Sequence, residues 1–124
     1  MTVNDNENIA PFDVDGTLVL NPSITDPKDS TYVEVYYPAT EKLITQRVNR
    51  AMVNLLKEEK MRGAFVLVWS RCGKEWAKNV INALALKGHV DYVMAKPRAY
   101  FDDLPVEEWL KDRIFIDANT RYKE

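Results

Sequence analysis

The sequence contains few of the residues on which several common kinds of functional site depend. Its 124 residues include one cysteine, Cys72, and one histidine, His89. A single cysteine cannot form an internal disulfide, which favours a reducing and therefore cytoplasmic environment. A zinc site built from clustered cysteine and histidine ligands is excluded, and a histidine-based triad would have to use His89. Carboxylates, hydroxyls and lysines remain as the groups that can carry chemistry.

Long hydrophobic runs and a strong excess of one charge are also absent. No apolar stretch approaches the roughly 20 residues that cross a bilayer, and residues 1–12 lack the basic and apolar regions of a signal peptide. A net charge of −2 does not by itself indicate nucleic-acid binding. With 46% hydrophobic and 29% charged residues, the composition is typical of a globular domain. We expect residues 1–124 to form a single domain with no membrane partner.

Hydrophobic patterning predicts an alternation of strands and helices, since continuous apolar runs are typical of buried strands and 3.6-residue spacing of helices. In chain order we expect a strand at 9–12, a hairpin of 32–37 with 43–48 inside an insertion at 18–47, a helix from about 48 to Gly63, a strand at 64–69, a helix at 74–87 closed by Gly88, a strand at 90–94, a short helix capped by Asp103, and a strand at 113–116. This order predicts an α/β fold, a Rossmann-like three-layer sandwich with a mainly parallel sheet and a small β-hairpin insertion after the first strand.

Each of four predicted strands ends at a residue whose side chain can take part in catalysis or ligand binding. These residues are Asp13, Ser70, Lys96 and Asp117. Ligands of open parallel sheets bind beyond the carboxyl ends of the strands. The sequence therefore predicts one site to which all four residues contribute.

The segment after the first strand carries the most specific pattern. Asp13 and Asp15 lie two residues apart, and Gly16 permits the sharp turn that brings both carboxylates into one site. One carboxylate can then act as nucleophile and metal ligand, and the other as general acid and base. The plainer interpretation is a strand that ends in a polar Asp-Gly turn. Taken singly, Ser70 is more typical of a turn, and Lys96 is more typical of a solvated loop.

Four segments, in order along the chain, resemble the motifs of the haloacid dehalogenase (HAD) superfamily. Phe12–Val19 (FDVDGTLV) resembles the first motif, and Val66–Ser70 (VLVWS) the second. Lys96-Pro97 resembles the third motif, and Ile114–Asp117 (IFID) the fourth. The first is highly specific, whereas the others are weak alone. The short chain is similar to small capless phosphatase-type members, such as those of phage genomes.

The resemblance implies a magnesium-dependent phosphatase and a role for each residue. Asp13 would attack phosphorus and become an aspartyl-phosphate, while Asp15 would protonate the leaving oxygen and then activate water. Ser70 would hydrogen-bond a phosphoryl oxygen, and Lys96 would neutralise charge. Asp13, the backbone carbonyl of Asp15, and Asp117 would hold Mg²⁺. Physical chemistry agrees, because a phosphoryl group in transfer needs cations and hydrogen-bond donors.

Two features depart from this pattern. Pro11 lies in the first predicted strand, where it cannot donate a backbone hydrogen bond. The fourth motif usually has two acids, but here Asp117 stands alone, and Asn119 is a further oxygen ligand nearby. Asp102 and Asp103 are rivals for the third metal ligand, although Asp103 also suits a helix cap.

The sequence also allows several alternatives. A signalling receiver domain also uses acids, a hydroxyl and a lysine, but its acceptor aspartate follows a later strand. A catalytically silent module of the same fold would bind phosphate or protein without turnover. Residues 18–47 are too short for a large cap, so the substrate is expected to be a sugar phosphate, a nucleotide or a phosphorylated nucleic-acid end. A homodimer would cover the edge of a minimal sheet.

Overall fold

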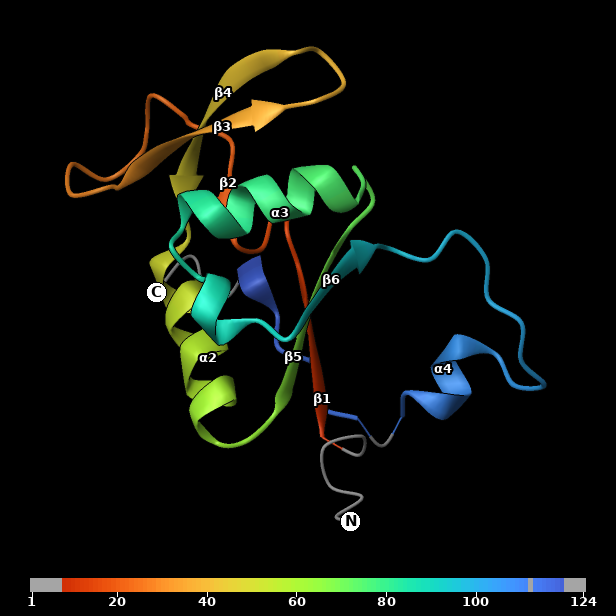
Figure 1. Ribbon diagram of the computed structural model, residues 1–124. Coiled ribbons are helices and arrows are strands. Elements are labelled where there is room, and N and C mark those ends of the chain that lie inside the picture. The colour runs from red at the N-terminus through yellow and green to blue at the C-terminus, as the bar shows by residue number, and fades with distance from the viewer. Residues whose placement is uncertain (1–7, 112, 120–124) are drawn as a thin grey trace.

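The chain folds into an α/β arrangement with two sheets, as a computed structural model of the protein shows for residues 8–111 and 113–119 (Figure 1). The first sheet contains β1 (Ile9–Asp13), β5 (Phe65–Ser70) and β6 (Tyr92–Ala95). All three strands are parallel, in the order β1-β5-β6. The predicted strands at 9–12, 64–69 and 90–94 are thus confirmed to within one or two residues.

Two helices cover one face of this sheet. Helix α2 (Arg50–Met61) connects β1 to β5 through the hairpin insertion, and α3 (Lys74–Ala83) connects β5 to β6. Both crossovers advance in the same direction across the sheet, so right-handed connections place both helices on the same side. The core accordingly joins Phe12, Val66 and Val68 to apolar residues of the two helices. None of the described helices has the length and apolar character needed to cross a membrane.

The opposite face of the sheet is much less covered. Along β5, Val66, Val68 and Ser70 are fully buried, whereas the alternate side chains, which point to the other face, are only half-buried. On that face Ile9 of β1 is 49% exposed and Tyr92 of β6 is 53% exposed. The α/β expectation therefore holds, but the described residues do not complete the third layer.

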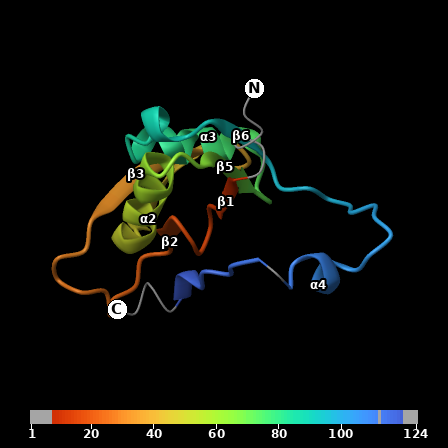
Figure 2. The ribbon, with the colours of Figure 1, turned by 90° about the horizontal axis from the view of Figure 1, so that it is seen from below.

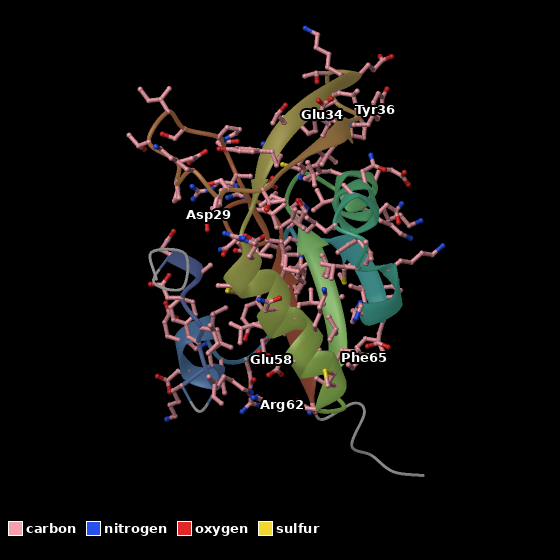
Figure 3. The ribbon with its side chains drawn as sticks, turned by 90° about the vertical axis from the view of Figure 1, so that its left-hand side faces the viewer. Asp29, Glu34, Tyr36, Glu58, Arg62 and Phe65 are labelled. Carbon is pink, nitrogen blue, oxygen red and sulfur yellow. The ribbon has the colours of Figure 1, made fainter. Side chains whose placement is uncertain are left out.

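The predicted hairpin insertion is present and packs against α3. Strands β2 (Val19–Leu20), β3 (Tyr32–Tyr37) and β4 (Lys42–Val48) form an antiparallel sheet in the order β2-β4-β3. The side-chain amide of Asn79 in α3 donates to the backbone carbonyl of Tyr36 at 2.9 Å. Figure 3 shows Glu34 and Tyr36 on the hairpin at the end of the molecule away from Phe65, which begins β5. The hairpin thus rises beyond the carboxyl ends of the parallel strands.

Helix α3 ends earlier than the sequence pattern predicted. We expected residues 74–87 to be helical and Gly88 to end the helix, but Ala85 adopts a left-handed backbone with φ of 56°. The N–H of Leu86 donates to the carbonyl of Ile81 at 2.9 Å, and that of Ala85 donates to the carbonyl of Asn82 at 3.1 Å. This pair of bonds is a Schellman motif. It turns the chain so that Leu86 is fully buried, which a continuing helix would prevent.

Residues 97–119, which we call the C-terminal arm, differ most from expectation. The predicted strand at 113–116 is wrong for this structure, because these residues form no strand. The short helix α4 (Val106–Trp109) begins after Pro105, and Asp103 does not cap it. Figures 1 and 2 show α4 standing apart from the sheet. Phe101, Ile114 and Phe115 are 84–91% exposed, although Ala118 returns to pack against the core.

Pro11 lies at the free edge of β1, where a further strand would pair. The N–H of Phe65 donates to the carbonyl of Asn8 at 2.8 Å. Successive residues of a strand direct their backbone groups to alternate sides. Asn8, Ala10 and Phe12 therefore face β5, and Pro11 faces the free edge. Proline is tolerated at a free edge because no neighbouring strand needs its N–H there, but a strand added at that edge would find one donor missing.

The loop before β3 is held by a buried ion pair. Arg47 donates to Asp26 at 2.6 Å, and the two side chains are 3% and 4% exposed. Asp26 also accepts hydrogen bonds from the Ser23 N–H at 2.9 Å and the Tyr32 hydroxyl at 2.8 Å. The Ser23 bond is the main cause that holds the pKa of Asp26 below its usual 3.8, with Tyr32 and Arg47 adding to it against the effect of burial.

We predict that Asp26→Asn destabilises the protein at pH 7 and that this difference shrinks in acid. A carboxyl whose folded pKa is depressed stabilises the fold above its unfolded pKa of about 3.9, and this contribution is lost as the pH falls through the folded value. Urea unfolding midpoints of both proteins from pH 7 to pH 3 test this. Asp29→Asn is the control, because its pair with Arg50 is 56–76% exposed and contributes little. A constant Asp26→Asn difference down to pH 3 would contradict the assignment.

Candidate functional site

Three of the four predicted strand ends meet at one edge of the parallel sheet. Asp13 ends β1 and pairs in register with Trp69, next to Ser70 at the end of β5. Lys96 follows β6, and its N–H donates to the carbonyl of Ser70 at 2.8 Å. The structure thus confirms that Asp13, Ser70 and Lys96 lie together. Asp117, expected from a fourth strand, lies on the C-terminal arm.

A tight loop after β1 presents both acidic side chains. The N–H groups of Thr17, Leu18 and Val19 all point at the carbonyl of Val14, at 3.1, 2.9 and 3.2 Å. Gly16 adopts φ of +81°, a conformation that L side chains rarely adopt. Because the loop winds around the fully buried Val14, Asp13 and Asp15 flank a fixed point of the core.

Asp13 lies beside one cation and one hydroxyl. The Nζ of Lys96 is 3.8 Å from Oδ1 of Asp13, and the Oγ1 of Thr17 donates to Oδ2 at 3.4 Å. The side chains of Lys96 and Asp13 are 37% and 34% exposed, so an incoming group can reach this carboxylate. Lys96 also lies 6.0 Å from the centre of the Trp69 ring. The sequence pattern did not assign a role to Thr17. Its position four residues after Asp13, beyond the turn at Gly16, is the feature that could have indicated this contact.

Asp15 is held by two neutral donors. The Ser70 hydroxyl donates to Oδ2 at 3.2 Å, and the indole N–H of Trp76 donates to Oδ1 at 3.0 Å. Trp76 is a core residue with 3% of its surface exposed, as its place among the apolar residues of the predicted helix at 74–87 indicates. Its contact with Asp15 was missed, because hydrophobic spacing says nothing of where an indole N–H points.

Ser70 links the acidic loop to the turn after β5. Its side chain is fully buried, and its Oγ accepts the Cys72 N–H at 3.0 Å while donating to Asp15. Gly73 adopts φ of +106° and donates to the Ser70 carbonyl at 3.2 Å, which closes the turn. A single hydroxyl therefore fixes two loops relative to each other.

The nearby thiol and phenol are both held in their neutral forms. Burial raises the pKa of the Cys72 thiol, and the charge of Asp15 and a hydrogen bond to it raise it further. The neighbouring Cys72 raises the pKa of Tyr37, and burial and Asp15 add to this. Because the thiolate is the nucleophilic form, the raised pKa of Cys72 argues against its use as a nucleophile.

The oxygen donors near Asp13 are of the kind that Mg²⁺ prefers. The Asp13 carboxylate and the Asp15 backbone carbonyl belong to one loop, so both are candidates to hold this ion. Within residues 8–111 and 113–119, no group of three or more histidine, cysteine, aspartate or glutamate side chains is arranged to hold a metal. The carboxylate of Asp117 accepts the Asn119 N–H at 2.9 Å. That of Asp102 accepts the N–H groups of the next two residues.

Comparisons of the chain with protein-family models, with curated proteins and with solved structures find no match. The residues and their geometry therefore carry the functional argument. They place one carboxylate beside a cation and a second carboxylate between two neutral donors, and carboxylates in such settings can act as a nucleophile and in proton transfer.

We predict that Ser70→Ala lowers the free energy of unfolding by about 1–3 kcal/mol, because the Cys72 N–H loses its acceptor and Asp15 loses a donor. Urea denaturation measures this loss. Ser30→Ala is the matched control, since the exposed Ser30 hydroxyl donates to the Pro27 carbonyl on the surface, and its change is expected to stay within about 0.5 kcal/mol. Equal effects of the two substitutions would show that Ser70 does not join the loops energetically.

Proposed function

We propose that this protein is a Mg²⁺-dependent phosphomonoester hydrolase of the HAD type that acts through an aspartyl-phosphate intermediate. The main support is the placement of Asp13 beside Lys96 at 3.8 Å, with Asp15 two residues on and bound to Ser70 at 3.2 Å. These are the four residues to which the sequence motifs assign catalytic roles. The accessible Asp13 suits a nucleophile, and the hydrogen-bonded Asp15 suits an acid and base.

In the first step, an oxygen of Asp13 attacks the phosphorus of the bound ester. The bond from phosphorus to the ester oxygen breaks, and that oxygen receives a proton from Asp15, so an alcohol leaves. Lys96 and the Thr17 hydroxyl, both beside Asp13, offset the negative charge on the phosphoryl oxygens. The Ser70 hydroxyl can turn to a phosphoryl oxygen when Asp15 carries the proton.

In the second step, Asp15 takes a proton from water, and the water oxygen attacks phosphorus. The bond from phosphorus to Asp13 breaks, which releases inorganic phosphate and restores the free carboxylate. Bound Mg²⁺ would supply positive charge that lowers the repulsion between Asp13 and the phosphate. The Asp13 carboxylate, the Asp15 carbonyl and Asp117 would hold it.

The third metal ligand and the third layer of the fold are linked in this proposal. The arm exposes large apolar side chains, while the uncovered sheet face includes Ile9 and Tyr92, each about half exposed. Bringing these surfaces together would bury apolar area, at roughly 25 cal/mol per Å². Docking of the arm would complete a three-layer, Rossmann-like sandwich and carry Asp117 toward Asp13. Pro11 limits the strength of pairing at that edge.

The site favours a substrate that can approach from open solvent. Asp13 and Lys96 are each about one-third exposed, and the small hairpin leaves space for groups attached to the phosphate. A sugar phosphate, a nucleotide or the phosphorylated end of a nucleic acid would fit a reducing, cytoplasmic setting. The second candidate is a catalytically silent module that binds phosphate or protein. It is favoured by the position of Asp117 on the exposed arm.

We predict Mg²⁺-dependent release of inorganic phosphate from at least one member of a panel of sugar phosphates, nucleotides and 5′- or 3′-phosphorylated oligonucleotides. EDTA should stop the reaction. Asp13→Asn should abolish it, because an amide is a poor nucleophile, and Asp15→Asn should slow it by about 10²–10⁴-fold. Asp29→Asn, an exposed substitution in the loop before β3, should retain wild-type turnover.

Phosphate release that persists unchanged in Asp13→Asn would refute the nucleophile. Binding of phosphate without turnover of any panel member would favour the silent module.

We also predict that Mg²⁺ raises the melting temperature of the wild-type protein and protects the arm from trypsin at Lys111 and Arg113. A ligand that binds only the folded state stabilises it, by about 2.7 kcal/mol at 100 times its Kd. Asp117→Asn should remove most of this effect, whereas Asp102→Asn should keep it. The reverse result would assign the third ligand to Asp102, and no response in any protein would contradict metal-linked docking.

A further inference from the structure

The two oxygens of the Asp15 carboxylate are bound separately. Trp76 donates its indole N–H to Oδ1 at 3.0 Å, and Ser70 donates its hydroxyl to Oδ2 at 3.2 Å. Two bonds to different oxygens fix the plane of the carboxylate. Each oxygen can accept a second hydrogen bond, so a proton-bearing group can still approach Asp15 from the open side.

The two donors differ in what they can do during a reaction. A serine hydroxyl can donate or accept and can rotate to a new partner. An indole N–H only donates, and does not give up its proton under ordinary conditions. Trp76 therefore cannot compete for the proton that Asp15 transfers, and its bond persists when Ser70 turns away. Trp76 is the fixed one of the two donors.

Packing leaves the Trp76 indole little freedom. It is 3% exposed, and the ring of Tyr37 packs edge-on against it, with centroids 5.1 Å apart and an interplanar angle of 72°. Tyr37 ends β3, the hairpin strand that Asn79 ties to α3 through the carbonyl of Tyr36. The hairpin thus restricts the indole through the Tyr37 ring, and the indole N–H in turn restricts the Asp15 carboxylate.

We infer that Trp76 is a positioning residue that aims the Asp15 carboxylate at the leaving oxygen of the substrate, with Tyr37 holding its ring. This inference rests on the proposed function. It assigns to a core tryptophan a task in the proton-transfer step, while bond formation to phosphorus stays with Asp13. Removal of the indole N–H should therefore harm the reactions that depend on protonation of the leaving group.

The test compares two substrates of the Mg²⁺-loaded protein. An alkyl phosphate needs a proton on its departing oxygen, whereas 2,4-dinitrophenyl phosphate releases a phenolate that leaves without one. The quantity measured is kcat/KM, which reports only the steps up to release of the leaving group and so omits hydrolysis of the intermediate. Trp76→Phe should lower kcat/KM for the alkyl phosphate by about 10²-fold, as expected for a misplaced catalytic group. The value for the dinitrophenyl ester should change by less than about threefold.

The control is Ile81→Val, which removes one methyl from the same buried face of α3 and leaves Trp76 in place. It should reduce kcat/KM of both substrates by the same small factor. Should Trp76→Phe fail to fold, Tyr37→Leu gives the same test, because loss of the packed ring frees the indole. It too should slow the alkyl phosphate selectively.

A second measurement does not use activity. In ¹⁵N-labelled protein, the indole N–H resonance of Trp76 should move upfield in Asp15→Ala, while that of Trp69 stays in place. An unmoved Trp76 resonance would overturn the contact.

The outcomes separate the two proposals. Equal losses for both substrates in an otherwise active protein would overturn the positioning role alone. Absence of turnover in the wild-type protein would overturn the proposed function together with this inference.

Discussion

The parallel pairing of β1 with β5 is the constraint on which the rest of the structure depends. Phe12 pairs with Val68, and both are buried against the helices. A slip of one residue would turn Phe12 to the uncovered face and direct Asp13 into the core, because side chains alternate along a strand. Hydrophobic burial therefore sets the register, and the register in turn places Asp13 opposite Trp69, at the edge of the sheet where β5 ends in Ser70. The geometry of the site is a by-product of how the core packs.

Much of the fold could be predicted because its signals are local. The apolar run before Ser70 and the spacing of apolar residues after Asn49 each specify an element without information from elsewhere in the chain. The end of α3 could not be predicted, since it depends on the burial of Leu86, a tertiary effect that places alanine where glycine is usual. The hydrogen bond from Trp76 to Asp15 could not be predicted either, because it joins residues 61 positions apart and uses the one polar group of a largely apolar side chain.

The C-terminal arm shows where local hydrophobic patterning fails to predict the structure. Residues 114–116 are as apolar as a buried strand, yet a strand needs a partner edge. The edge offered by β1 lacks one donor at Pro11. With Ile114 and Phe115 exposed by more than four-fifths, the composition of this segment and its position disagree. Such disagreement between levels is typical of functional or conditionally ordered regions, and it is the physical basis for linking the arm to the metal in our proposal.

The distances along the chain between the site residues have a consequence for synthesis on the ribosome. Asp15 leaves the ribosome before its hydrogen-bond partners, which lie 55 and 61 residues further on, and Lys96 follows later still. The antiparallel hairpin of β3 and β4 is local and can form as soon as it emerges, whereas the parallel sheet must wait for distant segments and pays a larger loop-closure entropy. A nascent chain therefore carries its acidic loop without the hydrogen bonds of Ser70 and Trp76, and without the cation of Lys96, until those residues have been added.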